Sequence, residues 1–167
     1  MNTGWRNAKK KPVSWSEIES LVKEETQVIV GTDSQPFSFG HCVVTAIAIL
    51  DSNQRRYFYK ERKVDSLNKR SLYERLLEET LNSVEVANAL RSTFPCLDIS
   101  VHLDIQKPGK RAKSSRYSNS LTSMVRGYGF ESIETKPDSW VASALADKLT
   151  KKPSYLKYKK RGGARLK

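Results

Sequence analysis

Apolar and polar residues follow one another along the first half of the chain with the period of short β-strands. Apolar, β-branched residues fill 27–33 and 41–50, and a charged run with three aromatic residues fills 54–63. Each run is short and is bounded by turn-forming residues, as expected of strands. The connections at 34–40 and 51–53 are brief, which predicts an antiparallel meander. The polar strand 54–63 is expected at an edge of the sheet, where charge blocks further pairing.

The second half alternates between helical and strand-like patterns. Apolar residues at intervals of three and four predict amphipathic helices, and Ser14 with Glu17 forms the signature of a capping box before the first of them. The predicted helices are 15–25, 68–92, 117–128 and 139–150, and the further strands are 97–104 and 130–135. After the first helix the order is βββαβαβα. This order predicts an α/β fold with a mixed five-stranded sheet and helices on both faces.

Positive charge is concentrated at the two ends of the chain. The 167 residues carry a net charge of +12, and the segments 1–12 and 151–167 contain basic but no acidic residues. We therefore divide the chain into a basic N-terminal arm (1–13), one folded domain (14–151) and a basic C-terminal tail (152–167). Cationic arms attract polyanions such as nucleic acid through counterion release. The alternative is a solvated tail that aids solubility.

The composition argues against several classes of protein. No apolar stretch is long enough to span a membrane, and the N-terminus lacks the apolar segment of a secretory signal. Cys42 and Cys96, with His41 and His102, lack the spacing of a zinc site. We expect both cysteines to be buried thiols of a protein in the reducing cytoplasm. Neither a glycine-rich phosphate loop nor a nucleophile elbow is present.

Acidic residues stand at the ends of several predicted elements. Asp33 ends the first strand and Asp104 ends the fourth, so parallel neighbouring strands would bring them to one edge of the sheet. Glu79 shares the apolar face of the long helix, although it could instead be a boundary residue that reaches water. Asp138 precedes the last helix, where it could act as an N-cap, a ligand or both. Asp147 projects to the opposite side of that helix and is expected in solvent.

Four converging carboxylates need a compensating cation, and oxygen ligands suit Mg²⁺ or Mn²⁺. Two such ions can activate water and stabilise the leaving oxygen of a phosphodiester. Basic residues after Asp104 and in the tail could bind the nucleic acid, or could be solvated: Lys107, Lys110, Arg111, Lys113, Lys157, Lys159, Lys160 and Arg161. His102 could assist a water or a phosphate, but we expect a hydrogen-bonded structural histidine.

The order of elements and acids resembles the ribonuclease H-like superfamily. Four motifs resemble, more narrowly, the YkuK family of ribonuclease H-like proteins: VIVGTDSQ at 28–35, VHLD at 101–104, GYGFE at 127–131 and KPDSWVASALADKLTK at 136–151. The resemblance covers about residues 14–151. It implies that Asp33 and Asp104 are metal ligands of the first and fourth strands and that Asp138 is the final acid. Glu79 matches the superfamily's helix position only through the face of the helix it occupies.

Three functions are compatible with this pattern. The first is a divalent-metal-dependent nuclease that hydrolyses RNA, an RNA–DNA hybrid or structured DNA, with Asp33, Glu79, Asp104 and Asp138 as its ligands. The second is a non-catalytic nucleic-acid-binding protein with the same fold. The third is a scaffold whose basic arms bind an acidic partner. Acids in the superfamily's order favour the first, and the sequence leaves the oligomeric state open.

Overall fold

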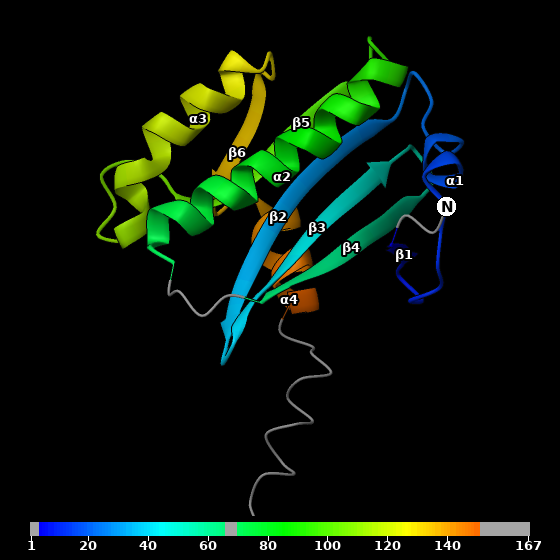
Figure 1. Cartoon of the computed structure of the whole chain (residues 1–167). Coiled ribbons are helices and arrows are strands. Elements are labelled where there is room, and N and C mark those ends of the chain that lie inside the picture. Colours follow the sequence, from blue (N-terminus) through cyan, green and yellow to red (C-terminus); the bar gives the residue numbers. More distant parts are fainter. Residues whose placement is uncertain (1–3, 66–69, 151–167) are drawn as a thin grey trace, which may run out of the picture.

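The computed structural model describes residues 4–65 and 70–150, which form a six-stranded mixed sheet flanked by helices (Figure 1). The strands are β1 (Trp5–Asn7), β2 (Gln27–Phe37), β3 (Gly40–Leu50), β4 (Arg55–Asp65), β5 (Asp98–Gln106) and β6 (Ser132–Lys136). They lie in the order β1-β4-β3-β2-β5-β6. β2, β3 and β4 form the predicted antiparallel meander, while β5 runs parallel to β2 and β6 parallel to β5. The predicted α/β fold class is confirmed.

The helices cover both faces of the sheet. They are α1 (Trp15–Glu19), α2 (Leu72–Thr93), a 3₁₀ turn η1 (Lys113–Tyr117), α3 (Ser118–Gly127), a π-helical segment η2 (Val141–Ala146) and α4 (Asp147–Thr150). The capping box at Ser14 and Glu17 is present, and Ser71 with Glu74 forms a second one before α2. α1 is shorter than predicted because the chain turns at Lys23, whose N–H and carbonyl both bond the Thr26 hydroxyl. Among the described residues, no helix is both long and apolar enough to cross a membrane.

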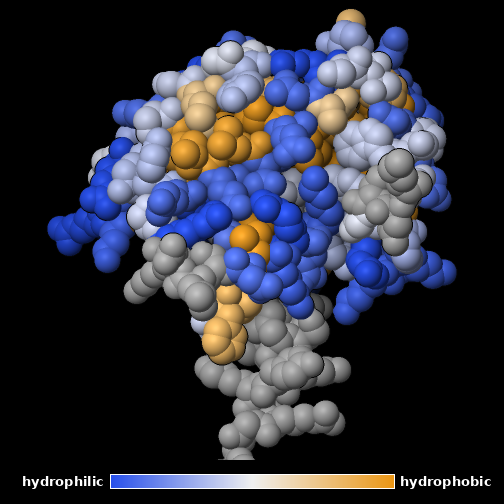
Figure 2. All heavy atoms as spheres, in the orientation of Figure 1, coloured by the Kyte–Doolittle hydropathy of each residue, from blue (hydrophilic) through white to orange (hydrophobic). Residues whose placement is uncertain are grey.

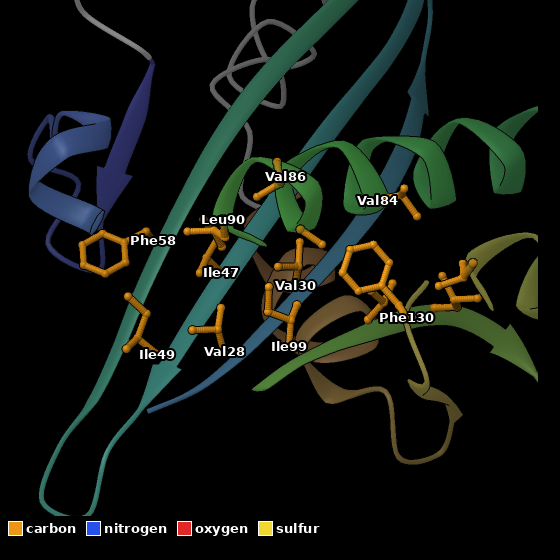
Figure 3. Packing of buried hydrophobic residues seen from close by; sticks show 14 of the residues in the cluster. Val28, Val30, Ile47, Ile49, Phe58, Val84, Val86, Leu90, Ile99 and Phe130 are labelled. Atoms are coloured by element: carbon orange, nitrogen blue, oxygen red, sulfur yellow. The ribbon is translucent and has the colours of Figure 1, made fainter. Parts of the chain in front are cut away.

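Two apolar cores lie on opposite faces of the sheet. On one face, α2 and α3 pack over side chains of the central strands, including Val28, Val30, Ile47 and Val101 (Figures 1 and 3). On the other face, η2 packs over a smaller cluster with several alanines. The same strands supply both cores because neighbouring residues of a strand point to opposite faces. The continuous apolar run 41–50 is explained by this double coverage.

Two predictions about the sheet were wrong. Residues 5–7, assigned to the basic arm, form β1 and pair with β4, so β4 is not an edge strand and the sheet has six strands instead of five. Trp5 is buried there and stacks near Trp15 of α1. The strand predicted at 27–33 is also longer than expected, because β2 stays paired with β3 as far as Phe37. A lone three-residue strand flanked by lysines gives too weak a periodic signal to be recognised.

The last helical segment packs closely against β2 because Gly31 has no side chain. A Cβ atom at Gly31 would lie 2.6 Å from the backbone nitrogen of Ala142. η2 is a π-helix instead of the predicted α-helix. A π-helix holds more residues per turn than an α-helix, which changes the direction of every side chain that follows it. Gly31 and the π-helical turn together therefore determine where α4 begins.

We predict that Gly31→Ala destabilises the protein, because its methyl group would push η2 away from the sheet. The expected loss is about 1–3 kcal/mol of unfolding free energy, the usual cost of overpacking. Denaturant unfolding measures it. Gly127→Ala is the matched control, since a Cβ there meets nothing within 4 Å and the residue ends α3. Equal losses in the two variants would contradict the close packing of η2 on β2.

We also predict that the two thiols of the native protein differ in reactivity. Cys96 is exposed, whereas Cys42 is buried and donates a hydrogen bond to Glu61. Burial, followed by the charge of Glu61, raises the pKa of Cys42 to about 12. At pH 8 one thiol should react quickly with an aromatic disulfide reagent, and the second only after denaturation. Cys96→Ser should abolish the fast reaction; if it persists, Cys42 is accessible.

Candidate functional site

Asp33 and Asp104 occupy equivalent places on neighbouring parallel strands. The last registered pair between β2 and β5 is Thr32 with Leu103, and each aspartate is the next residue of its strand. Along each strand, the residues of the core under α2 occupy every second position, and the two aspartates occupy the positions between them. Both aspartates therefore point to the face covered by η2. Asp33 is buried and Asp104 is half-buried. The predicted proximity of the two aspartates is therefore observed, but neither ends its strand as expected, because β2 continues to Phe37 and β5 to Gln106.

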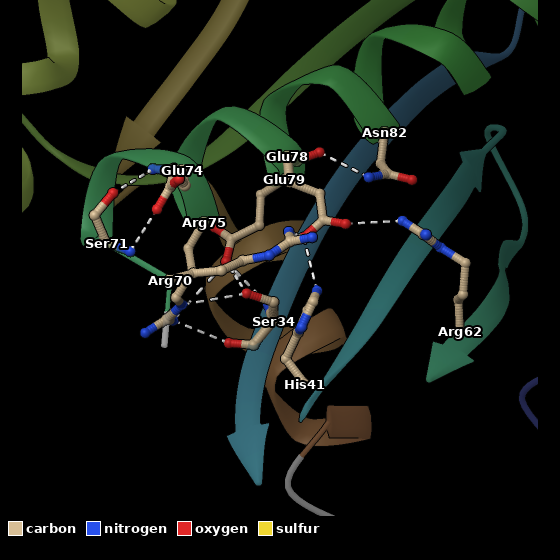
Figure 4. Close-up of polar contacts among 10 residues, drawn as sticks. All are labelled: Ser34, His41, Arg62, Arg70, Ser71, Glu74, Arg75, Glu78, Glu79 and Asn82. Carbon is tan, nitrogen blue, oxygen red and sulfur yellow. Dashed lines mark hydrogen bonds and ion pairs between the residues drawn. The ribbon is translucent and has the colours of Figure 1, made fainter. Parts of the chain in front are cut away.

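Glu79 reaches the same edge from the other face. It is 4% exposed, so the expectation that it faces the sheet is confirmed. Its Oε1 accepts hydrogen bonds from the Ser34 backbone N–H (3.1 Å) and the Ser34 hydroxyl (2.5 Å). Arg75, one turn earlier on α2, donates to the Ser34 carbonyl at 3.1 Å and lies 4.0 Å from Glu79 (Figure 4). Glu79 and Arg75 thus both hold Ser34, the residue after Asp33.

The pKa of Glu79 responds to burial and to both neighbouring aspartates. Burial raises the pKa of Glu79 to about 8, against the opposing effect of the Ser34 hydrogen bonds. The negative charges of Asp33 and Asp104 raise this pKa further, while Arg75 lowers it. Charges on β2 and β5 therefore act on a carboxylate of α2. This edge of the sheet is a region of converging negative charge.

Two lysines neutralise neighbouring acids. Nζ of Lys136, at the end of β6, lies 2.8 Å from Oδ1 of Asp104. Asp104 Oδ1 is buried and accepts no hydrogen bond of good geometry, so Lys136 contacts it as an ion pair. Asp138 is different: its side chain is 55% exposed and pairs with Lys107 at 3.0 Å. The structure thus places Asp138 in solvent beside the site, and its charge still reaches His102.

Asp147 is the acid that sequence reasoning missed. It was expected in solvent, but it is half-buried at the start of α4. The Gln35 side-chain nitrogen lies 3.4 Å from both Asp33 Oδ2 and Asp147 Oδ1, so it bridges the two carboxylates. The error came from assuming α-helical geometry through 139–150, whereas the π-helical turn redirects Asp147 toward β2. No local sequence signal distinguishes these alternatives.

His102 fixes the beginning of the last helical segment. It is buried on β5, and its Nδ1 accepts a hydrogen bond of 3.2 Å from the Val141 backbone N–H. Burial lowers the pKa of His102 to about 4, against the opposing charge of Asp138. Its ring also meets Trp140 edge to face. These contacts agree with the expected structural histidine, which holds η2 against the sheet.

The donors at this edge suit a divalent cation in their chemistry. They are carboxylate oxygens from β2, α2 and β5, and one of them, Asp104 Oδ1, is buried without a hydrogen bond. In the conformation described for residues 4–65 and 70–150, however, no three His, Cys, Asp or Glu side chains are arranged to hold a metal ion. Ser34, Arg75 and Lys136 occupy their oxygens instead. A cation would therefore have to displace Lys136 from Asp104.

The basic residues predicted to contact nucleic acid fall in two places. Four of them are exposed: Lys107, Lys110 and Arg111 lie between β5 and η1, and Lys113 begins η1. The Ser115 hydroxyl donates to the carbonyls of Lys110 and Ala112, which gives this loop a defined shape. Lys157, Lys159, Lys160 and Arg161 lie outside the described residues. Their role stays a prediction.

A second charged cluster lies next to Glu79 on the α2 face. Glu78 accepts hydrogen bonds from His41 and Arg62 at 2.9 Å and also pairs with Arg70 (Figure 4). Glu78, Arg62 and Arg70 border a groove of about 860 Å³ between α2 and β4. Hydrophobic residues gather over the upper part of this face, with hydrophilic ones around them (Figure 2). Because Glu78 contacts His41 and two arginines, we assign it to holding α2 on the sheet.

Two comparisons with known proteins gave a match. The family model described as ribonuclease H-like matches residues 15–151. A solved structure, the crystal structure of LC11-RNase H1 in complex with an RNA/DNA hybrid, is 10% identical, covers 75% of this chain and 94% of its own, and superimposes with a TM-score of 0.46. No protein with curated annotation matches significantly. Since the family model covers most of its length, the chain belongs to the ribonuclease H-like family.

Proposed function

We propose that this protein is a divalent-metal-dependent nuclease that hydrolyses phosphodiester bonds in RNA, an RNA–DNA hybrid or structured DNA. One observation carries the proposal: Asp33 and Asp104 lie side by side on β2 and β5, and Glu79 of α2 bonds Ser34, the residue after Asp33. Membership of the ribonuclease H-like family supports it. The four sequence motifs given above support a place in the YkuK branch, and the free thiols of Cys42 and Cys96 favour the reducing cytoplasm.

The chain's own residues have distinct tasks in this proposal. Asp33, Glu79 and Asp104 would hold Mg²⁺ or Mn²⁺, with Asp147 as a fourth carboxylate beside Asp33 in place of the predicted Asp138. When bound, such ions activate water and stabilise the leaving oxygen. Ser34 and Arg75 keep Glu79 and β2 aligned. The exposed lysines and arginine of 107–113 would bind the phosphate backbone.

A non-catalytic nucleic-acid-binding protein is the second candidate. The observation in its favour is the ion pair of Lys136 with Asp104, which already compensates one of the carboxylates without a metal. Under this alternative the acids would serve the fold, and nucleic acid would bind to the basic surface alone. Cleavage and metal binding separate the two candidates.

We predict that Asp33→Asn and Asp104→Asn abolish metal-stimulated cleavage, because each removes a charged ligand while keeping the side chain's shape. The rate should fall at least a hundredfold, since even loss of a residue that only supports a ligand costs about 10- to 100-fold. Cleavage of labelled RNA, hybrid and DNA in Mn²⁺ measures the rate. Both variants should still bind nucleic acid in a gel-shift assay. If the wild-type protein cleaves none of these substrates, the nuclease proposal is wrong and the non-catalytic binding protein is the remaining candidate.

Asn substitutions at Asp147 and Asp138 test which acid completes the site. Asp147→Asn should weaken cleavage strongly, because Asp147 lies with Gln35 and Asp33. Asp138→Asn, the matched control, should change it by no more than about threefold, because that carboxylate is exposed and its ion pair with Lys107 contributes little. The reverse order of effects would restore Asp138 as the final ligand.

We further predict that Lys136→Met increases affinity for divalent cations. Lys136 and the cation compete for Asp104, so removal of the ammonium group should tighten Mn²⁺ binding about tenfold, equivalent to about 1.4 kcal/mol. Calorimetric titration of Mn²⁺ into the full chain measures this without any substrate. Lys107→Met is the control, because Lys107 pairs with the exposed Asp138 and not with Asp104. Unchanged affinity in Lys136→Met would show that the lysine does not compete.

A further inference from the structure

Three consecutive lysines near the N-terminus lie in a rigidly bonded turn. After β1, the Asn7 side chain accepts hydrogen bonds from the backbone N–H groups of Lys9 and Lys11, at 3.0 and 3.1 Å. The Asn7 backbone bonds Lys10 and Lys11, and Arg6 donates to the Lys10 carbonyl. Lys10 itself has a φ of +64°, a left-handed conformation that costs about 1 kcal/mol for a residue with a side chain. The turn is therefore held in one strained shape.

This turn faces further cations across a groove. The groove, of about 620 Å³, lies between the turn, α1 and the beginning of β4. Lys9 and Lys11 line one side, and Arg55 and Arg56 line the other. Arg56 is paired with Asp51, and the acid among the described lining residues, Glu17, is bonded within its capping box. The groove thus keeps an excess of positive charge from segments far apart in the sequence.

Aromatic side chains lie between these cations. Tyr57 and Phe58 of β4 line the groove, and Tyr57 also lines a smaller hollow of about 210 Å³ on the other face, beside Lys10 and Lys148. Lys9 and Lys11 therefore lie at the groove, and Lys10 lies at the hollow on the other face of the sheet. Like charges held together repel one another, and a strained backbone that maintains them indicates a ligand of opposite charge. Phe58 is buried in the core, so the half-buried ring of Tyr57 is the aromatic surface beside these cations, and such a combination suits a nucleic-acid strand.

We propose that the 8–11 turn and Arg55 form a second nucleic-acid-binding site that contacts backbone phosphates away from the carboxylates. The proposal rests on the proposed function, because it assigns the substrate's second contact. Register places Val44 of β3 opposite both Asp33 of β2 and Glu61 of β4, so Glu61 is level with Asp33, whereas Arg55 pairs with Leu50 at the opposite end of the meander. Six residues of strand span about 20 Å. Figure 1 shows β1 and α1 on this side of the sheet, away from the hairpin between β2 and β3.

The separation sets the length of nucleic acid that can use both sites. Phosphates follow one another at about 3.4 Å of axial rise along each strand of a duplex, so 20 Å corresponds to about six nucleotides. A duplex of 18 base pairs is long enough to reach from the carboxylates to the groove. Each phosphate contact contributes about 0.9 to the slope of the logarithm of affinity against the logarithm of salt concentration.

The test compares Lys9→Gln/Arg55→Gln with the control Lys23→Gln/Arg126→Gln, which removes one exposed lysine and one exposed arginine elsewhere. Binding of an 18-base-pair DNA duplex to the full chain is measured by fluorescence anisotropy at several salt concentrations, with EDTA present. The salt slope of the groove variant should fall by about 1.8, and that of the control should not change. Thermal unfolding confirms that both variants are folded.

Identical slopes in the two variants would overturn the proposal. If the groove variant instead loses affinity for polyglutamate while its duplex slope is unchanged, the groove binds an acidic polypeptide. Because EDTA prevents metal-dependent cleavage, the result does not depend on whether the protein is a nuclease. A failure of the carboxylate variants and a failure of the groove variant are therefore distinguishable.

Discussion

The buried hydrogen bonds between Glu79 and Ser34 are the constraint on which the site depends. A carboxylate with 4% exposure is costly to bury unless donors surround it, and here one residue supplies both a backbone and a side-chain donor. Ser34 follows Asp33, so the contact fixes the position of Asp33 relative to α2. Ser83 continues the polar line by donating to Thr32, which in turn donates to Thr45. α2 is thus joined to β2 and β3 by polar contacts within an apolar core.

The carboxylates at the sheet edge are compensated by cations of the protein itself. Lys136 faces Asp104, Arg75 faces Glu79, and Lys107 faces Asp138. Converging negative charges destabilise a fold when nothing opposes them, and these side chains oppose them in the absence of a metal. The same contacts keep the acids from closing around a cation as they stand. Stability without a metal and affinity for one are therefore opposed at this edge, and Lys136 is the residue on which both depend.

The sequence predicted most of what places the site. Periodicity gave the meander, the long helix and the two parallel strands, and those elements bring Asp33 and Asp104 together. The helical face of Glu79 was also predictable, because α2 is regular along its whole length. Asp147 was not, since its direction depends on a π-helical turn that is stabilised by packing against Gly31 and by His102. β1 was missed for a related reason: a short strand is decided by its partner β4 and not by its own residues.

The π-helical segment makes chain length as important as residue type in this part of the protein. Residues 141–146 have more residues per turn than an α-helix would have. The segment begins where Val141 bonds His102 and ends just before Asp147. Loss of a single residue from this segment would restore α-helical winding without changing its alanine-rich character. Asp147 would then be rotated by about 100° around the helix axis, away from Gln35. The position of Asp147 relative to Asp33 thus depends on the number of residues in the π-helical segment. A deletion there would therefore be more harmful than most substitutions.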